Sequence, residues 1–197
     1  MSLIRFAIVL AVAFLLGGCI SAPPPKYQPG ISNTQVLIQP AREKLGVGKF
    51  NAAPGVENAH LSVRGSSLNG GSDGTFSGYL RDALITELQT AGKYDANSDT
   101  QISGTLTGNR IETPIKTGTA DVAAHFIVTK SGSTVYDKTF SAHHEWESSF
   151  VGAIAIPAAM QNYATAVQKL LGQLFNDPDF AKATMKSGSE GEPASAP

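Results

Sequence analysis

Cysteine, charge and long hydrophobic runs are all scarce in this chain of 197 residues. Its single cysteine, Cys19, leaves no partner for an intramolecular disulfide. Charged residues make up 16% of the sequence and the formal net charge is −1, so nothing in the composition favours nucleic acid, whose binding requires a clustered basic surface. Beyond the N-terminal segment, no apolar run reaches the ~18 residues of a transmembrane helix. The folded part must therefore be stabilised by packing alone.

The N-terminal segment has the pattern of a secretory signal. Arg5 supplies a positive charge, and residues 6–16 are uncharged and apolar. This stretch is shorter than the ~20 residues that span a bilayer, and it has the length of the apolar part of an export signal. Gly17 and Gly18 then form a small-residue cleavage site directly before Cys19. Because a lone cysteine in an exported chain cannot form an internal disulfide, it needs another use.

The run Leu16-Gly17-Gly18-Cys19 resembles the lipobox of bacterial lipoproteins. The resemblance implies that residues 1–18 are removed as a signal peptide. It also implies that the thiol of Cys19 carries a diacylglyceryl group and that the new amine is acylated, with palmitate as a typical chain. At about 0.8 kcal/mol per buried methylene, three chains anchor a protein permanently. Ile20, rather than Asp, follows the cysteine. In enteric-type bacteria this implies the outer membrane and a periplasm-facing domain, with the inner membrane as the alternative.

Composition divides the mature chain into three parts. Residues 19–33 join the lipidated cysteine to a proline-rich tether that favours extended polyproline II. Residues 34–183 are predicted to form a single domain, long enough to bury a hydrophobic core. Residues 184–197 contain no aromatic or branched aliphatic side chain, and we predict a disordered tail there.

Two segments have the periodicity of amphipathic helices. Apolar residues recur every fourth position over residues 76–88, where Ser72 or Asp73 is the predicted N-terminal cap and Gly92 the C-terminal one. The second helix is predicted to begin at Pro157, because proline suits the first turn of a helix.

Between the two helices the apolar pattern changes to every second residue. This predicts a three-stranded antiparallel meander over residues 100–111, 119–129 and 134–147. Residues 130–133 are predicted to form a tight hairpin turn. Residues 34–39 and 60–64 are predicted to add one or two N-terminal strands. With both helices packed on the apolar face of the meander, the fold is a two-layer α+β sandwich.

The densest group of potential metal ligands is His143-His144-Glu145-Trp146-Glu147. On a strand, His143, Glu145 and Glu147 share one face, and His125 on the neighbouring strand could join them as a zinc ligand. Three such positions spread over about 13 Å, which is too far for one ion. A solvated sheet face explains the run better. A metal-dependent envelope enzyme stays the least favoured alternative, and we expect no catalytic residue, metal or cofactor.

Residues 150–160 contain no charge and no hydrogen-bonding side chain. They form either a buried connection to the last helix or an exposed apolar site that contacts a partner or the bilayer. The candidate partner-binding residues are Phe150, Val151, Ile154 and Ile156.

The helix sequence GYLRDAL at residues 78–84, followed by Glu87 and Leu88, is similar to that of small α+β envelope lipoproteins. These include the lipopolysaccharide-assembly lipoprotein and the auxiliary lipoproteins of ABC-type lipid transporters. The resemblance implies a non-catalytic accessory or binding subunit of an envelope assembly or transport complex, whose partner is a protein or a lipid and not nucleic acid. The alternative is an oligomer-forming secretion or pore-associated lipoprotein. Cys19 is the only residue to which a functional role of these families can be assigned, because only the lipobox matches position by position.

Overall fold

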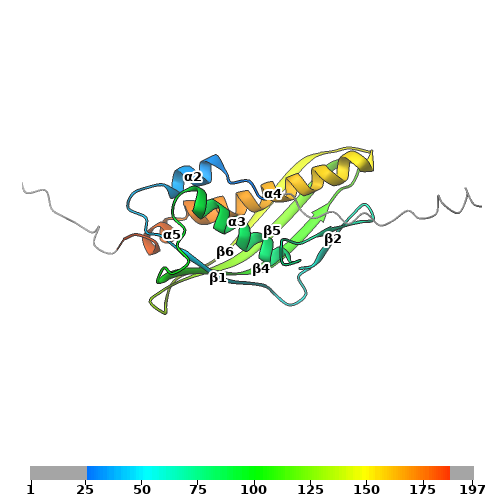
Figure 1. The fold of residues 1–197 in the computed structure, drawn as a ribbon. Helices are drawn as coiled ribbons and strands as arrows, with labels where there is room; N and C mark the ends of the chain where they lie inside the picture. The colour runs from blue at the N-terminus through cyan, green and yellow to red at the C-terminus, as the bar shows by residue number, and fades with distance from the viewer. Residues whose placement is uncertain (1–25, 187–197) are drawn as a thin grey trace, which may run out of the picture.

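Four strands form the sheet on which the rest of the protein packs (Figure 1). The computed structural model describes residues 26–186. The strands follow the spatial order β1 (Gly46–Ala52), β4 (Thr100–Glu112), β5 (Lys116–Lys130) and β6 (Ser133–Ser148). Within the sheet β1 is parallel to β4, whereas β5 is antiparallel to both of its neighbours. The predicted three-stranded meander is therefore confirmed as β4, β5 and β6.

The turn between β5 and β6 shows why the meander could be predicted. Ser131 and Gly132 have φ angles of 49° and 82°, so both residues of the two-residue turn are left-handed. This geometry matches the right-handed twist of the two strands that it joins. The predicted turn at residues 130–133 is confirmed.

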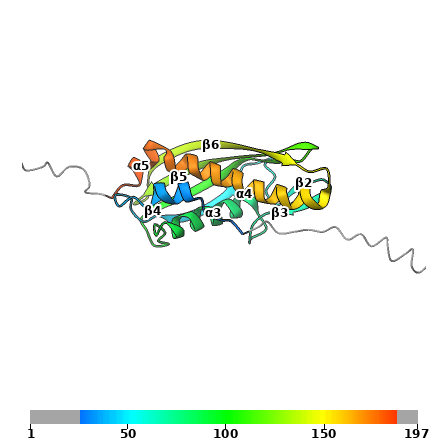
Figure 2. The same cartoon turned by 90° about the horizontal axis from the view of Figure 1, so that it is seen from above.

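Helices cover one face of the sheet and leave the other face open. Figure 2, which looks down on this layer, shows α3 and α4 side by side over the strands. The helix α2 packs against both of them. The helical segments are α2 (Ile31–Leu37), α3 (Phe76–Thr90), α4 (Gly152–Asn176) and the short α5 (Pro178–Ala183). The predicted two-layer α+β sandwich is confirmed.

The core lies between these two layers. Alternate residues of β5, from Ala120 to Val128, are buried beneath the helices. Leu80, Leu84 and Leu88 of α3 meet them from the helical side with side chains that are almost wholly buried. Burial of each such leucine contributes about 1.5–3 kcal/mol relative to an exposed one.

A second, two-stranded sheet lies beside the end of the molecule where α4 begins (Figure 1). It is the antiparallel hairpin of β2 (His60–Val63) and β3 (Ser66–Asn69), joined by Arg64 and Gly65. The strand predicted at residues 60–64 is thus present, but it pairs only with β3 and not with the meander.

The strand predicted at residues 34–39 is wrong. The chain forms α2 there, with Asn33 and Leu37 buried one turn apart and Ile38 exposed. Six residues are too few to separate a helical from a strand pattern when no partner is known. The edge strand β1 was not predicted, because its glycine-rich sequence GVGKFNA carries a weak apolar alternation.

Both predicted helix starts also need correction. Thr75, rather than Ser72 or Asp73, caps α3, and its side chain accepts a hydrogen bond from the amide of Gly78. Asp73 instead accepts hydrogen bonds from the amide and hydroxyl of Thr75. The helix α4 begins at Gly152, so Pro157 lies inside it. The first turns of α4 therefore come from the segment predicted as a connection.

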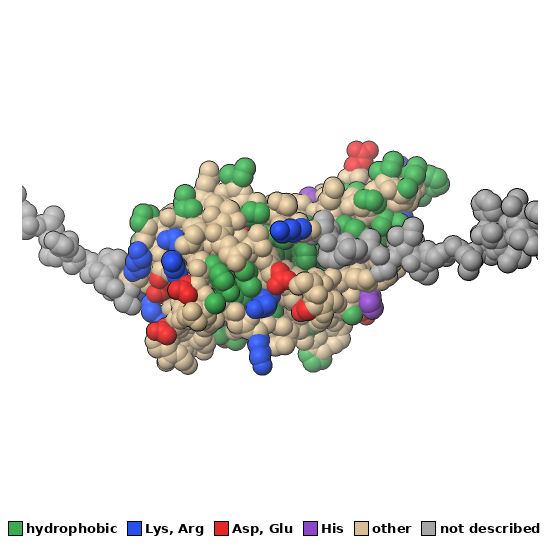
Figure 3. All heavy atoms as spheres, in the orientation of Figure 1, with side chains coloured by type: hydrophobic (Ala, Val, Ile, Leu, Met, Phe, Trp, Pro, Cys, Tyr) green, Lys and Arg blue, Asp and Glu red, His purple; other side chains and the backbone are tan. Residues whose placement is uncertain are grey.

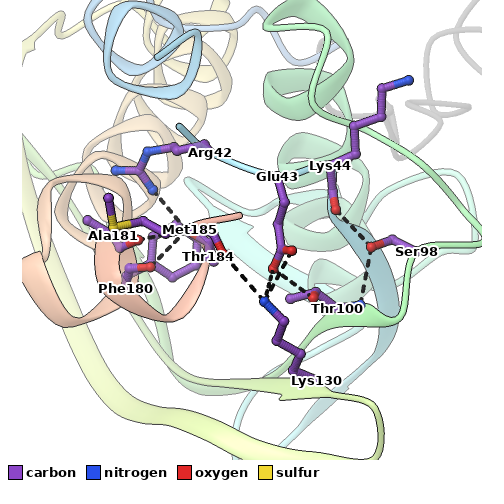
Figure 4. A network of polar contacts seen from close by, with 10 residues as sticks. All are labelled: Arg42, Glu43, Lys44, Ser98, Thr100, Lys130, Phe180, Ala181, Thr184 and Met185. Atoms are coloured by element: carbon purple, nitrogen blue, oxygen red, sulfur yellow. Dashed lines mark hydrogen bonds and ion pairs between the residues drawn. The ribbon is translucent and has the colours of Figure 1, made fainter. Parts of the chain in front are cut away.

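The folded domain extends beyond both predicted boundaries. Tyr27 is buried on the N-terminal side, and Thr184 is fully buried on the C-terminal side. Figure 4 shows Arg42 donating to the hydroxyl of Thr184 at 3.2 Å, next to the Glu43–Lys130 ion pair. The amide of Lys186 donates to the carbonyl of Ala41 at 3.0 Å. The predicted signal peptide, Cys19, the start of the tether and the tail after residue 186 lie outside the described residues.

Candidate functional site

Exposed apolar side chains gather at the end of the molecule where α4 begins (Figure 3). The exposed fractions are 76% for Phe150, 52% for Val151, 59% for Ile154 and 60% for Ile115. We call these four residues the apolar tip. Contiguous exposed apolar surface on a soluble domain usually marks a site of interaction.

The sheet brings the two segments of the apolar tip together. Lys116, at the start of β5, pairs with Ser148 at the end of β6, so the β4–β5 turn lies beside the β6–α4 connection. The hydroxyl of Ser149 accepts a hydrogen bond from the amide of Val151, and the carbonyl of Val151 accepts from the amides of Ile154 and Ala155. The connection is therefore an ordered helix start, not a loose loop.

Arg64 fastens the hairpin of the small sheet to both of these segments. Its guanidinium donates to the carbonyls of Thr113 at 2.9 Å and Phe150 at 2.8 Å. It also reaches the carbonyl of Pro114 at 3.4 Å and the hydroxyl of Ser148 at 3.3 Å. Arg64 has a φ of 50°, a left-handed conformation that costs a non-glycine residue energy and indicates a specific constraint.

Three of the four predicted partner-binding residues are exposed, and the fourth is not. Ile156 is partly buried and packs against the core, and its neighbours Ala155 and Ala159 are fully buried. Ile156 therefore anchors the first turns of α4, whereas Phe150, Val151 and Ile154 face solvent. Their role in partner binding stays a prediction.

The outward face of α4 that leads away from the tip is uncharged. Residues 150–168 contain no Asp, Glu, Lys, Arg or His. Ile154, Gln161 and Gln168 follow each other at intervals of seven residues, so they lie on one face of the helix. The described chain starts on this face, where the side chain of Gln168 donates to the carbonyl of Gln28 at 3.2 Å. A hollow of about 470 Å³ lies there, lined by Lys26, Gln28, Gln161, Ala164, Thr165 and Gln168.

A buried carboxyl group holds the start of the chain in place. Glu87 of α3 is fully buried, and its Oε1 accepts hydrogen bonds from the hydroxyl of Tyr27 at 2.6 Å, the amide of Gly30 at 3.0 Å and the amide group of Asn33 at 2.8 Å. Burial and the contact with Glu87 raise the pKa of Tyr27 far above its ordinary value. The last part of the predicted tether is thus built into the domain.

The histidines predicted as possible ligands lie on the open face of the sheet. His143 contacts Asp121 at 2.6 Å and Glu145 at 3.3 Å, and these hydrogen bonds raise its pKa. His125 pairs instead with Asp137. Within residues 26–186, no group of three or more His, Cys, Asp or Glu side chains is arranged to hold a metal ion. The structure therefore separates the two predicted histidine ligands: His143 contacts Asp121 and Glu145, whereas His125 contacts Asp137.

A groove of about 700 Å³ lies beside the His143–Asp121 pair, under residues 55–57. Asn109 fixes this loop by donating to the carbonyl of Glu57 at 2.7 Å, and it accepts from the hydroxyl of Tyr163 at 2.8 Å. The imidazole of His143 can exchange a proton there. The groove floor consists of small residues on three strands: Gly108, Ala123 and Ser141.

Comparison with known proteins gives a fold and no family. No family model matches the sequence, and no curated protein matches it. The fold is similar to that of a Xanthomonas campestris protein of the DUF330 family, at 18% identity and a TM-score of 0.50 over 79% of this chain and 95% of the other.

Two further solved structures are more distant. A candidate lipoprotein from Caulobacter crescentus has 12% identity and a TM-score of 0.46, over 79% of this chain and 97% of its own. A minor lipoprotein from Acinetobacter baumannii has 10% identity and a TM-score of 0.39, over 68% of this chain and 94% of its own. The similarity to the Xanthomonas campestris protein, at 18% identity, concerns the fold alone.

Sequence reasoning missed Ile115, Arg64 and Glu87. An isoleucine between Pro114 and Lys116 in a turn was a usable signal, because turns seldom expose large apolar side chains. Nothing in the sequence marked Arg64, since three of its four partners are backbone carbonyls, 49 to 86 residues away.

In the described part of the chain, no helix combines the length and apolarity that would carry it through a bilayer.

Proposed function

We propose that this chain is a lipoprotein of the outer membrane, facing the periplasm, and a non-catalytic accessory subunit of an envelope assembly or transport complex. The observation that carries the proposal is the run Leu16-Gly17-Gly18-Cys19 at the end of an export signal, placed just before an ordered domain. Lipidation of Cys19 would use the chain's single thiol.

The distance between Cys19 and the domain supports a role close to the membrane. Lys26 is the first described residue, so six residues lie between it and Cys19, and seven residue-to-residue steps join the two. Because an extended chain covers at most about 3.6 Å per residue, this segment reaches no more than about 25 Å. Glu87 holds Tyr27 and Gly30, which makes the attachment point a fixed part of the domain.

Two features favour binding over catalysis. The apolar tip offers a surface for association, whereas His143 sits solvated on the open sheet face with its acidic partners. A catalytic acid or base works best where water is excluded and its neighbours are fixed.

The lipid anchor is tested by the mass of the mature protein from cells fed a clickable palmitate analogue. We expect an N-terminus at acylated Cys19, incorporation of the label, and sedimentation with outer-membrane vesicles. The Cys19→Ser variant should incorporate no label. A wild-type product that begins at another residue, or that carries no lipid, would refute the proposal.

The accessory role is tested by photocrosslinking in intact cells from Ile154, with Val135 as the matched position. Val135 is 44% exposed and lies at the opposite end of β6. An envelope component captured from either position, with a defined native mass for the complex, supports the accessory role. A complex that contains copies of this chain alone would favour the oligomer-forming alternative.

A further inference from the structure

We infer that the apolar tip and the uncharged outward face of α4 lie on the lipid bilayer, so that this surface contacts lipid instead of a protein. The inference rests on the proposed lipidation of Cys19, and it goes further because it assigns the ligand of the tip and the orientation of the domain.

The composition of α4 is the first argument. A helix on the surface of a soluble domain normally carries charge on its outward side. On α4, the outward positions from Ile154 to Gln168 carry none, and the first charged residue after the tip is Lys169. The exposed positions of this face include Ile154, Pro157 and Gln161, so it presents apolar and neutral polar side chains and no acid that a negatively charged lipid headgroup would repel.

The place where the chain enters the domain is the second argument. Lys26 and Gln28 lie against Gln161 and Gln168, on the helix face that also presents Ile154. At 1.5 Å per residue, Ile154 lies about 10 Å from Gln161 along the axis of α4, toward the start of the helix. The seven steps of chain from Cys19 to Lys26 reach up to about 25 Å, so an anchor in the bilayer permits the tip to touch the same membrane.

The distribution of charge around the tip fits the same contact. Lys116 is exposed beside the apolar side chains, where its ammonium group can meet lipid phosphates, whereas Arg64 uses its guanidinium on the backbone of the tip. Glu145 and Glu147 are exposed on β6 at positions that alternate with inward-facing Trp146. Figure 3 shows an acidic side chain at the edge of the apolar patch, so this edge faces water in the proposed contact.

The size of the tip argues against a second copy of the chain as its partner. Four side chains with these exposed fractions present about 400–500 Å² of apolar surface. A stable protein–protein interface buries about 800 Å² on each partner. A surface of this size, held rigid by Arg64, suits shallow insertion of a few side chains beside an existing lipid anchor.

The test uses the full-length lipidated protein in vesicles of phosphatidylethanolamine and phosphatidylglycerol. The Cys19 sulfur is alkylated in the mature chain, so a cysteine introduced by Ile154→Cys is the only free thiol and accepts an environment-sensitive fluorophore. Val135→Cys gives the matched control at the far end of β6. Phe150→Cys provides a second position in the tip should one variant fold poorly.

We expect shallow nitroxide lipids to quench the label at position 154 at least threefold more than at position 135, and aqueous iodide to show the reverse. Equal quenching at the two positions, on protein that floats with the vesicles, overturns the inference and leaves the lipid anchor intact. Energy transfer between labelled copies at position 154 without lipid quenching also overturns it. Wild-type protein that does not float at all refutes the proposed function itself.

Discussion

Replacement of Glu87 by alanine should release the N-terminal segment from the domain. The carboxyl group accepts three hydrogen bonds at one oxygen, and it is the point at which Tyr27, Gly30 and Asn33 are attached to α3. Asn33 keeps a second acceptor, the carbonyl of Gln168 at 3.1 Å. The hydroxyl of Tyr27 and the amide of Gly30 would lose the acceptor that Glu87 provides.

The magnitude follows from these orphaned groups. A buried donor without a partner costs about 1–3 kcal/mol, so two of them lower the free energy of unfolding by about 2–6 kcal/mol in Glu87→Ala. Glu87→Gln retains an acceptor of the same shape, but it places an amide where Oε2 has no hydrogen-bond partner among the described residues. We therefore expect a smaller loss, about 1–2 kcal/mol.

Urea denaturation and hydrogen exchange measure the two effects separately. The midpoint should fall in the order wild type, Glu87→Gln, Glu87→Ala, and amides of residues 26–38 should exchange faster in both variants. The matched control is Glu57→Ala. Because Glu57 is exposed, this substitution should lower the free energy of unfolding by less than about 0.5 kcal/mol. If Glu87→Ala matched the control in stability and Gly30 stayed protected, the role assigned to Glu87 would be wrong.

Three further predictions concern other parts of the molecule. Arg64→Ala should speed amide exchange at residues 113–116, because the hydrogen bonds from Arg64 to this turn are lost. It should lower the free energy of unfolding by only about 1–2 kcal/mol, since these bonds join surface segments. Unchanged exchange at these residues would contradict the role assigned to Arg64. Asp121→Asn should lower the pKa of His143, measured by NMR titration, because the hydrogen bond to Asp121 is the main cause of its raised value; an unchanged titration would count against that pair. Burial and the contact with Glu87 raise the pKa of the Tyr27 hydroxyl in the folded state. Above pH ~10 the hydroxyl of Tyr27 therefore loses its proton in the unfolded chain but keeps it in the folded one. The free energy of unfolding is then full below that pH and falls as the pH rises, by up to about 1.4 kcal/mol per pH unit. Urea unfolding between pH 8 and 11 should therefore show a shallower decline in Tyr27→Phe, and parallel curves would exclude the effect.

The sequence predicted the elements whose own residues determine them. The meander was predictable because its apolar residues alternate over long strands and a two-residue turn joins β5 to β6. The helix α3 was predictable because its leucines recur at one-turn intervals and Gly92 ends it with a φ of 67°.

Elements that depend on distant partners were mispredicted or missed. The helix α2 is held by Glu87, more than 50 residues away, and β1 exists because it pairs with β4 across α3. For the candidate site, an uncharged segment at residues 150–160 was visible in the sequence. Its helical start and its connection to Ile115 through Arg64 depend on backbone carbonyls, which a sequence pattern does not reveal.

Backbone hydrogen bonds join the two ends of the domain: the amide of Lys186 donates to the carbonyl of Ala41, and the amide of Glu43 donates to the carbonyl of Thr184. Because a polypeptide is synthesised from its N-terminus, these bonds form only after residues 184–186 have been made. The last contacts of the domain are therefore added at the end of synthesis, when the rest of its chain is already available.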